Sequence, residues 1–262
     1  MKKVFALLLA LSMVFALCAC GSSSAPAATT APAADAAPAA DAPAESYSLN
    51  FTTGGSAGTY YAYGSVLAQY ISSNSNVSVT AVTGNGSQAN VNDLDAGATD
   101  LAFCQSDVMS YAYNGTNLFE ETGAVTSFSV VADLYLEQVQ IVTTNPDIKT
   151  VADLKGKVVS VGAIGSGVYF NALDVLGVYD ITLDDITPVY QSFGDSAESL
   201  KDGKIDAGFI VAGAPTTAIT DLATSKSVYL VSLDDEHIDQ LLAKSPYYTK
   251  YTITADTYGL PE

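Results

Sequence analysis

A repeated pattern of four residues constrains the fold of this chain more than any other feature. The pattern Leu-x-x-Gly-x-x-Asp-x-x-Phe occurs twice, 106 residues apart, as Leu94, Gly97, Asp100 and Phe103 and as Leu200, Gly203, Asp206 and Phe209. Gly55-Ser56 recurs in the same order, 110 residues later, as Gly165-Ser166. Glycine is common after helices, so a chance likeness of two helix ends is the alternative. The ordered pairing of both features favours two halves of similar build.

Hydrophobic periodicity predicts the same order of elements in each half. In the first half we expect strands at 47–52, 77–82 and 100–103, separated by helices at 60–71 and 88–95. In the second half we expect strands at 157–161, 186–190 and 207–211, separated by helices at 168–176 and 196–201. This βαβαβ order predicts an α/β protein with two lobes, each a central sheet flanked by helices.

Two lobes of this kind predict a ligand site between them. In open α/β sheets, ligands bind beyond the carboxyl ends of the strands, where helices begin. Facing lobes also form a cleft that a hinge motion closes. Because the free N–H groups of a helix start attract negative charge, we expect a small polar solute that is neutral or anionic. A monocarboxylate or an amino acid is favoured over a dicarboxylate, since the chain has no arginine to hold a second carboxylate in a bidentate pair.

The charge balance excludes two classes of partner. The ten basic residues are all lysines and face 28 acidic residues, a net charge of −18. Nucleic-acid binding needs a basic surface, so no nucleic-acid partner is expected. Electrostatic attachment to anionic lipid is disfavoured for the same reason.

The first twenty residues have the character of an export signal. Lys2 and Lys3 precede an apolar run over 4–17, which is too short for a stable membrane span. The run ends in Leu-Cys-Ala-Cys, which resembles the lipobox of bacterial lipoproteins, so we expect a signal peptide over 1–19 and lipidation of Cys20. Residues 20–45 are then a disordered Ala/Pro/Ser linker. These features predict an extracytoplasmic protein anchored to the bacterial cell membrane; an ordinary signal peptide with incidental cysteines is the alternative.

The sequence contains few arrangements of residues that are typical of catalytic sites. The single histidine, His237, follows three acidic residues and is expected at a helix start, with Asp234 and Asp235 as helix-start charges. Cys104 is expected to be a small buried apolar side chain. The glycines over 162–167 lack the spacing of a dinucleotide-binding loop. We therefore expect no catalytic residue, no metal and no cofactor.

Five blocks of sequence, in order, resemble the TAXI family of solute-binding proteins, the extracytoplasmic subunits of tripartite ATP-independent (TRAP) transporters. The blocks are TGGSAGTYYAYG at 53–64, NGSQANV at 85–91, DLAFCQSD at 100–107, VADLKGKVVSVG at 151–162 and LKDGKIDAGFIVAGAP at 200–215. Many members of this family carry an arginine at the position that aligns with Leu173, so this chain departs from them in having no guanidinium there.

The resemblance implies a two-lobed periplasmic-binding-protein-like fold, similar to type II, with a hinge between the lobes. We expect lobe 1 over 46–137, lobe 2 over 138–228, and a return to lobe 1 over 229–262 that is incomplete because the chain ends before the family's last elements. The implied function is capture of a small, carboxylate-bearing solute and its delivery to the membrane permease of a TRAP transporter, without enzymatic activity.

Candidate ligand-binding residues follow from their places in turns at strand ends or helix starts. On lobe 1 these are Gly55, Ser56, Tyr60, Asn85, Ser87, Gln105 and Ser106, and on lobe 2 Gly165, Ser166, Gly167, Ala212 and Pro215. Several of them could be turn formers only. Two other functions remain open at this point: a binding protein that feeds a signalling receptor, and a secreted enzyme of the same fold class.

Overall fold

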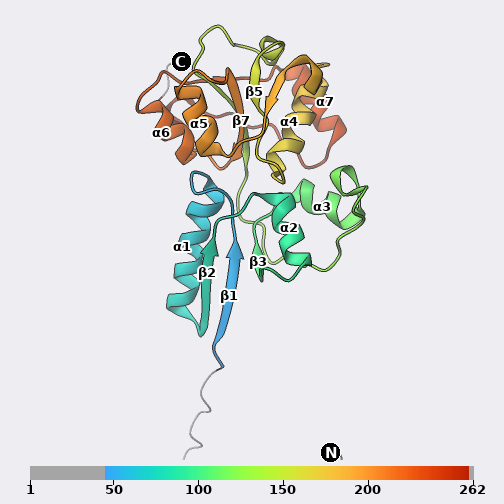
Figure 1. The fold of residues 1–262 in the computed structure, drawn as a ribbon, viewed down its shortest axis with the longest axis vertical. Helices are drawn as coiled ribbons and strands as arrows, with labels where there is room; N and C mark the ends of the chain where they lie inside the picture. The colour runs from blue at the N-terminus through green and yellow to red at the C-terminus, as the bar shows by residue number, and fades with distance from the viewer. Residues whose placement is uncertain (1–44, 260–262) are drawn as a thin grey trace, which may run out of the picture. The chain divides into compact units, whose positions relative to one another are not determined.

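A computed structural model describes residues 45–259 and places them in two sheets (Figure 1). The first sheet has the strand order β2-β1-β3 and is entirely parallel, as the βαβαβ pattern predicts. Its strands are β1 (Tyr47–Thr52), β2 (Val77–Val82) and β3 (Leu101–Ala102). Its helices are α1 (Thr59–Asn74), α2 (Ser87–Asp95) and α3 (Ser106–Asn114), followed by a short 3-10 turn at Asn117–Phe119.

The second sheet has five strands in the order β6-β5-β7-β4-β8. The strands are β4 (Gln138–Thr143), β5 (Val158–Ser160), β6 (Thr187–Val189), β7 (Ala207–Ala212) and β8 (Tyr229–Val231). The helices are α4 (Gly167–Val178), α5 (Phe193–Lys201), α6 (Thr217–Ala223) and α7 (Asp235–Lys244), and 3-10 turns lie at Val151–Leu154, Leu183–Asp185 and Ala255–Thr257. β4 runs antiparallel to β7 and β8.

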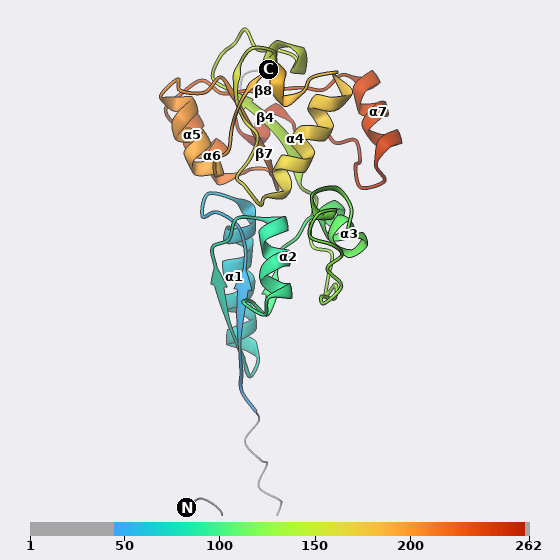
Figure 2. The same cartoon turned by 45° about the vertical axis from the view of Figure 1, so that its right-hand side comes forward.

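The alternation of side chains along β7 places one hydrophobic core on each face of this sheet. Phe209 packs in the core that contains residues of α4 and α7, whereas Ile210 packs in the core that contains residues of α5 and α6. Every residue of β7 is buried, as expected for a central strand covered on both faces. Figure 2 shows α7 next to α4 and α6 next to α5.

The repeated sequence pattern builds the same corner in both lobes. Gly97 and Gly203 follow α2 and α5 with φ of 66° and 69°, the left-handed conformation that ends many helices. The two aspartates then cap the neighbouring strand: Asp100 Oδ2 accepts the N–H of Asn50, and Asp206 Oδ2 accepts the N–H of Val158, both at 2.8 Å. Both copies of the four-residue pattern therefore have the same structural role.

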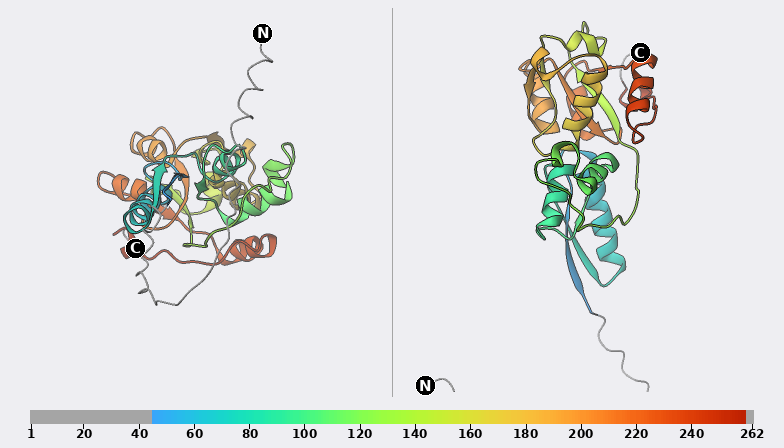
Figure 3. Two further views of the ribbon diagram at one scale, coloured as in Figure 1. Left: turned by 90° about the horizontal axis from the view of Figure 1, so that it is seen from below. Right: turned by 90° about the vertical axis from the view of Figure 1, so that its right-hand side faces the viewer.

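The segment 128–137, which contains no helix or strand, joins the two sheets (right-hand view of Figure 3). After this segment, the chain remains part of the second sheet beyond residue 228, where lobe 2 was predicted to end. β8 pairs with β4, and Leu241 of α7 belongs to a core of the second sheet. The prediction that the chain returns to lobe 1 from residue 229 is therefore wrong for these elements. Among the residues described, no helix is long and apolar enough to cross a membrane.

Candidate functional site

A pocket with about 610 Å³ of space free of atoms, part of it open to solvent, is lined by residues of both lobes. Eight of the twelve predicted ligand-binding residues line it: Gly55, Tyr60, Asn85, Ser87, Gln105, Ser166, Gly167 and Ala212.

The other four predicted residues are not among those that line the pocket. Ser56, Ser106 and Pro215 are exposed outside it, and Gly165 turns its carbonyl to the N–H of Ala89 at 2.9 Å. The misplacement of Ser56 has a geometric cause. Ser166 is itself the residue that precedes α4, whereas Ser56 lies two residues before Gly58, which precedes α1. The Gly55-Ser56 and Gly165-Ser166 pairs are therefore not equivalent in the structure.

Four helices begin at the pocket: α1 through Thr59 and Tyr60, α2 through Ser87, α4 through Gly167 and Val168, and α5 through Phe193. The residues before α1, α2 and α4 accept no hydrogen bond from the first turn through a side chain. The first N–H groups of a helix have no acceptor within the helix. The pocket thus presents the N-terminal ends of helices, which favour a carboxylate or another anionic oxygen group.

Ser166 is the pocket residue whose side chain most clearly lacks a hydrogen-bond partner. The residue is only 6% exposed, it lines the pocket, and its Oγ has no hydrogen-bond partner among the residues described. A serine before a helix ordinarily accepts an N–H from the first turn. Buried hydroxyls are almost always paired, so this one is free to bind a ligand.

Gln105 lies where the lobes meet. Its Nε2 donates to Asn171 Oδ1 on α4 at 2.7 Å, and its backbone N–H donates to Ser87 Oγ at 3.0 Å. A Cβ on Gly167 would lie 1.5 Å from Gln105 Oε1 and 2.9 Å from Ser87 Oγ, so only glycine fits at that position with these neighbours in place. Gln105 therefore makes polar contacts both with Ser87 of its own lobe and with Asn171 of the other lobe.

Glu137 is a pocket residue that the sequence did not indicate. It is the last residue of the segment between the sheets, and its Oε2 accepts a hydrogen bond from Tyr60 Oη at 3.0 Å. Burial raises the pKa of Glu137 to about 8, and the donor Tyr60 opposes this rise only in part. Tyr60 itself stacks on Phe103, with 4.8 Å between ring centroids. No local signal could have found Glu137, because its segment has no periodicity.

Gln191, Ser192 and Phe193 also line the pocket and were not predicted. They stand at the start of α5, where Ser192 Oγ accepts the N–H of Asp195 at 3.2 Å. This Ser-x-x-Asp spacing is a helix-start signal in the sequence and could have identified them. Leu173, by contrast, is half-buried on α4 and is not among the residues that line the pocket.

The residues first considered for catalysis have structural roles. Burial raises the pKa of the Cys104 thiol to about 12, which makes it a poor nucleophile. His237 lies in the first turn of α7, where its ring stacks on Tyr179 at 3.6 Å between centroids. Asp234 precedes the helix and accepts the N–H of His237 at 3.1 Å, as helix-start charges should. Among the described residues, no group of three or more His, Cys, Asp or Glu is arranged to hold a metal.

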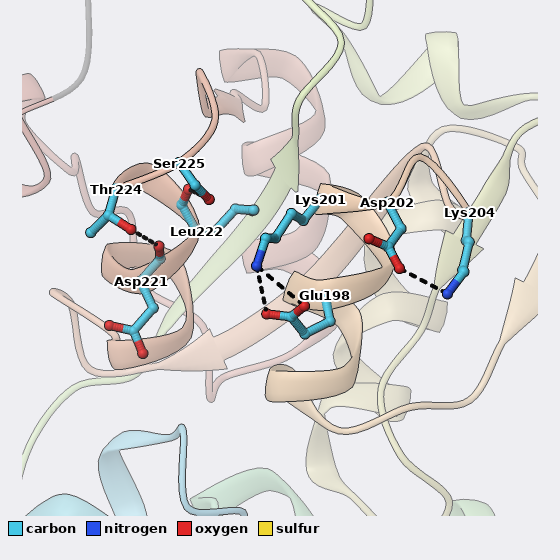
Figure 4. Close-up of polar contacts among 8 residues, drawn as sticks. All are labelled: Glu198, Lys201, Asp202, Lys204, Asp221, Leu222, Thr224 and Ser225. Carbon is cyan, nitrogen blue, oxygen red and sulfur yellow. Dashed lines mark hydrogen bonds and ion pairs between the residues drawn. The ribbon is translucent and has the colours of Figure 1, made fainter.

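A second hollow lies between α5 and α6 (Figure 4). Its charged groups are exposed and engage each other: Lys201 pairs with Glu198 at 3.3 Å, and nearby Lys204 pairs with Asp202 at 2.8 Å. Thr224 Oγ1 donates to the carbonyl of Asp221 at 2.7 Å. Exposed ion pairs of this kind contribute little to stability. No described residue that lines this hollow has a buried polar side-chain atom without a hydrogen-bond partner, as Ser166 has in the first pocket.

The comparisons with known proteins agree with this architecture. A family model described as the NMT1-like family matches residues 51–262. An ancestral arginine-binding protein bound to glutamine is 18% identical, with a TM-score of 0.50 over 71% of this chain and 78% of that one. A protein from Bordetella bronchiseptica RB50 is 16% identical, with a TM-score of 0.52 over 70% of this chain and 56% of that one.

The alkanesulfonate-binding protein SsuA from Xanthomonas axonopodis pv. citri, bound to MOPS, is 22% identical with a TM-score of 0.48. The match covers 72% of this chain and 62% of that protein, so this chain spans less than two thirds of its length. The two structures with TM-scores of 0.50 and 0.52 show an α/β fold of the periplasmic-binding-protein type, as predicted.

Proposed function

This chain belongs to the NMT1-like family, and from that premise we propose that it is an extracytoplasmic receptor for a small polar solute. The solute binds between the lobes, through a carboxylate held by the helix starts, and is released unchanged. The observation that carries the proposal is the buried Oγ of Ser166, which has no partner among the described residues, in a pocket where the uncapped helices α1, α2 and α4 begin. The solved structures of the same fold include proteins with amino acids or a sulfonate bound, which supports the assignment.

The finer part of the proposal concerns the partner. We propose that the protein delivers its solute to the permease of a TRAP transporter. The support is the resemblance of 53–64 and 85–91 to blocks of the TAXI family, since both blocks contribute residues to the pocket. We also propose that lipidated Cys20 anchors the protein to the outside of the cell membrane; Cys20 and the signal peptide lie outside the described residues.

A binding screen tests the receptor assignment. Thermal unfolding is followed with a panel of amino acids, monocarboxylates, dicarboxylates, sugars and polyamines, and each hit is titrated by calorimetry. The expected result is saturable binding of a carboxylate-bearing compound that is recovered unchanged. Conversion of the compound to a product would identify an enzyme, and binding of polyamines alone would contradict the carboxylate assignment.

The pocket supplies a matched pair of variants for the same screen. Ser166→Ala removes the free hydroxyl, and Ser225→Ala removes a hydroxyl in the second hollow. Ser166→Ala should weaken binding by about 2- to 10-fold, the effect of one hydrogen bond, with little change in stability because its Oγ has no partner to lose. Ser225→Ala should bind like the wild type.

A further inference from the structure

Glu137 is the only Asp, Glu, Lys or His among the residues that line the pocket. Its carboxyl group accepts a hydrogen bond from Oη of Tyr60, a residue of the first turn of α1. In its ionised form this carboxyl group would repel an anionic ligand and attract a cationic one. The pocket therefore offers two opposite chemistries: N–H donors and Ser166 Oγ, and a carboxylate.

The groups around Glu137 give its carboxylate no cation. The titratable groups that affect the pKa of Glu137 or of its donor Tyr60 are Tyr135, Cys104 and Asp107. All three are neutral or acidic. Burial without a positive partner explains why the pKa of Glu137 is about 8. The chain has no arginine, and no lysine lines the pocket. The ionised form of Glu137 therefore has no positive partner among the described residues.

We propose that the ligand is a free amino acid, whose ammonium group binds the Glu137 carboxylate and whose carboxylate binds the starts of the helices and Ser166 Oγ. The inference rests on the proposed function as a solute receptor and specifies its ligand class. Binding an ammonium requires ionised Glu137, so a protein with Glu137 protonated releases that proton to solvent as the ligand binds.

The experiment compares each amino-acid ligand with its two halves. The probes are the standard L-amino acids, then, for each hit, the acid without the amino group and the amine without the carboxyl group. For L-leucine these are isocaproate and isoamylamine. Calorimetry at pH 6 and pH 7 measures the dissociation constants for the wild type, for Glu137→Gln, which keeps the shape of the side chain, and for Glu120→Gln, an exposed control in the first lobe.

The expected result is that the intact amino acid binds at least tenfold more tightly than either half. Binding to the wild type should strengthen by roughly tenfold from pH 6 to pH 7, as Glu137 loses its proton below a pKa of about 8. Glu137→Gln should lose that pH dependence and weaken binding, whereas Glu120→Gln should retain the wild-type values.

The outcomes separate this inference from the receptor assignment. Equal binding of the deaminated acid, with Glu137→Gln unaffected, would overturn the amino-acid inference and leave the receptor intact. Binding that weakens as the pH rises would also overturn it, since it would show protonated Glu137 donating to the ligand. Failure of every compound in the wider panel to bind would overturn the receptor assignment itself. Unchanged thermal unfolding of Glu137→Gln without ligand confirms that the variant is folded.

Discussion

Gln105 of the first lobe donates its side-chain N–H to Asn171 of the second lobe, at 2.7 Å. Asn171 is 2% exposed, and its Nδ2 donates to Asp107 of the first lobe at 3.0 Å and to Tyr248 at 2.9 Å. Tyr248 in turn donates to Asp174 at 2.9 Å. This chain of hydrogen bonds joins α3 to α4, so it stabilises the arrangement in which both lobes line the pocket.

Replacement of Asn171 by Ala should lower stability. The change removes a donor from the carboxyl group of Asp107, which is 4% exposed and whose pKa burial already raises. Leaving a buried polar group unpaired costs about 1–3 kcal/mol, which urea unfolding measures. Asn74→Ala serves as the control, because Asn74 is exposed and contacts only its own helix. Equal unfolding midpoints for the two variants would contradict the assigned role of Asn171.

Replacement of Gly86 by Ala should impair ligand binding more than stability. Gly86 precedes α2 with φ of 104°, and an added Cβ would lie 3.2 Å from the Cα of Ser166 in the other lobe. The alanine would strain the backbone at this positive φ, and its Cβ would press on a main-chain atom of the other lobe. Both effects oppose the close approach of the lobes. Gly97→Ala is the control, since Gly97 also has a positive φ, of 66°, but faces open space. Calorimetry should show weaker binding for Gly86→Ala alone; equal losses in the two variants would show that strain, not lobe contact, is responsible.

The free protein should become less stable as the pH rises towards 8. Burial raises the pKa of Glu137 from 4.5 to about 8, so between these values the folded state holds a proton that the unfolded state has released. The free energy of unfolding attributable to Glu137 therefore falls with pH, by no more than about 1.4 kcal/mol per pH unit. Chemical unfolding from pH 5 to pH 8 should give a steeper decline for the wild type than for Glu137→Gln. Parallel declines would show that Glu137 is ionised in the empty pocket.

Replacement of Cys20 by Ala should release the protein from the membrane. The change removes the residue that would carry the lipid, and the chain after it is too acidic for electrostatic attachment, with 8 lysines against 28 acidic residues once residues 1–19 are removed. Immunoblots of membrane and soluble fractions measure the distribution, with Cys18→Ala as the control that should remain in the membrane. A Cys20→Ala protein that stays fully membrane-bound would contradict the lipoprotein proposal.

The sequence predicted the parts of the site that local patterns encode. Periodicity and glycine turns located the starts of α1, α2 and α4, and these carry most of the predicted residues that line the pocket. Gln105 was identifiable because a polar residue follows directly after an apolar strand. Such features depend on a few neighbouring residues and so can be read without the fold.

Non-local contacts account for what the sequence did not indicate. Glu137 reaches the pocket only because residues 128–137 cross between the sheets, and β4 finds its partner β7 some seventy residues later in the chain. The expected equivalence of Ser56 and Ser166 failed through a difference of two residues in where their helices begin. The placement of β8 in the second sheet likewise follows from pairing with β4, not from its own three residues.

A crystal structure of the protein with its tightest-binding compound from the screen tests the central claim most directly. The account predicts density for that compound between the lobes, within hydrogen-bond distance of Ser166 Oγ and of the first-turn N–H groups of α4. Density for the compound at another surface, or in the pocket but away from Ser166 and the helix starts, would contradict it.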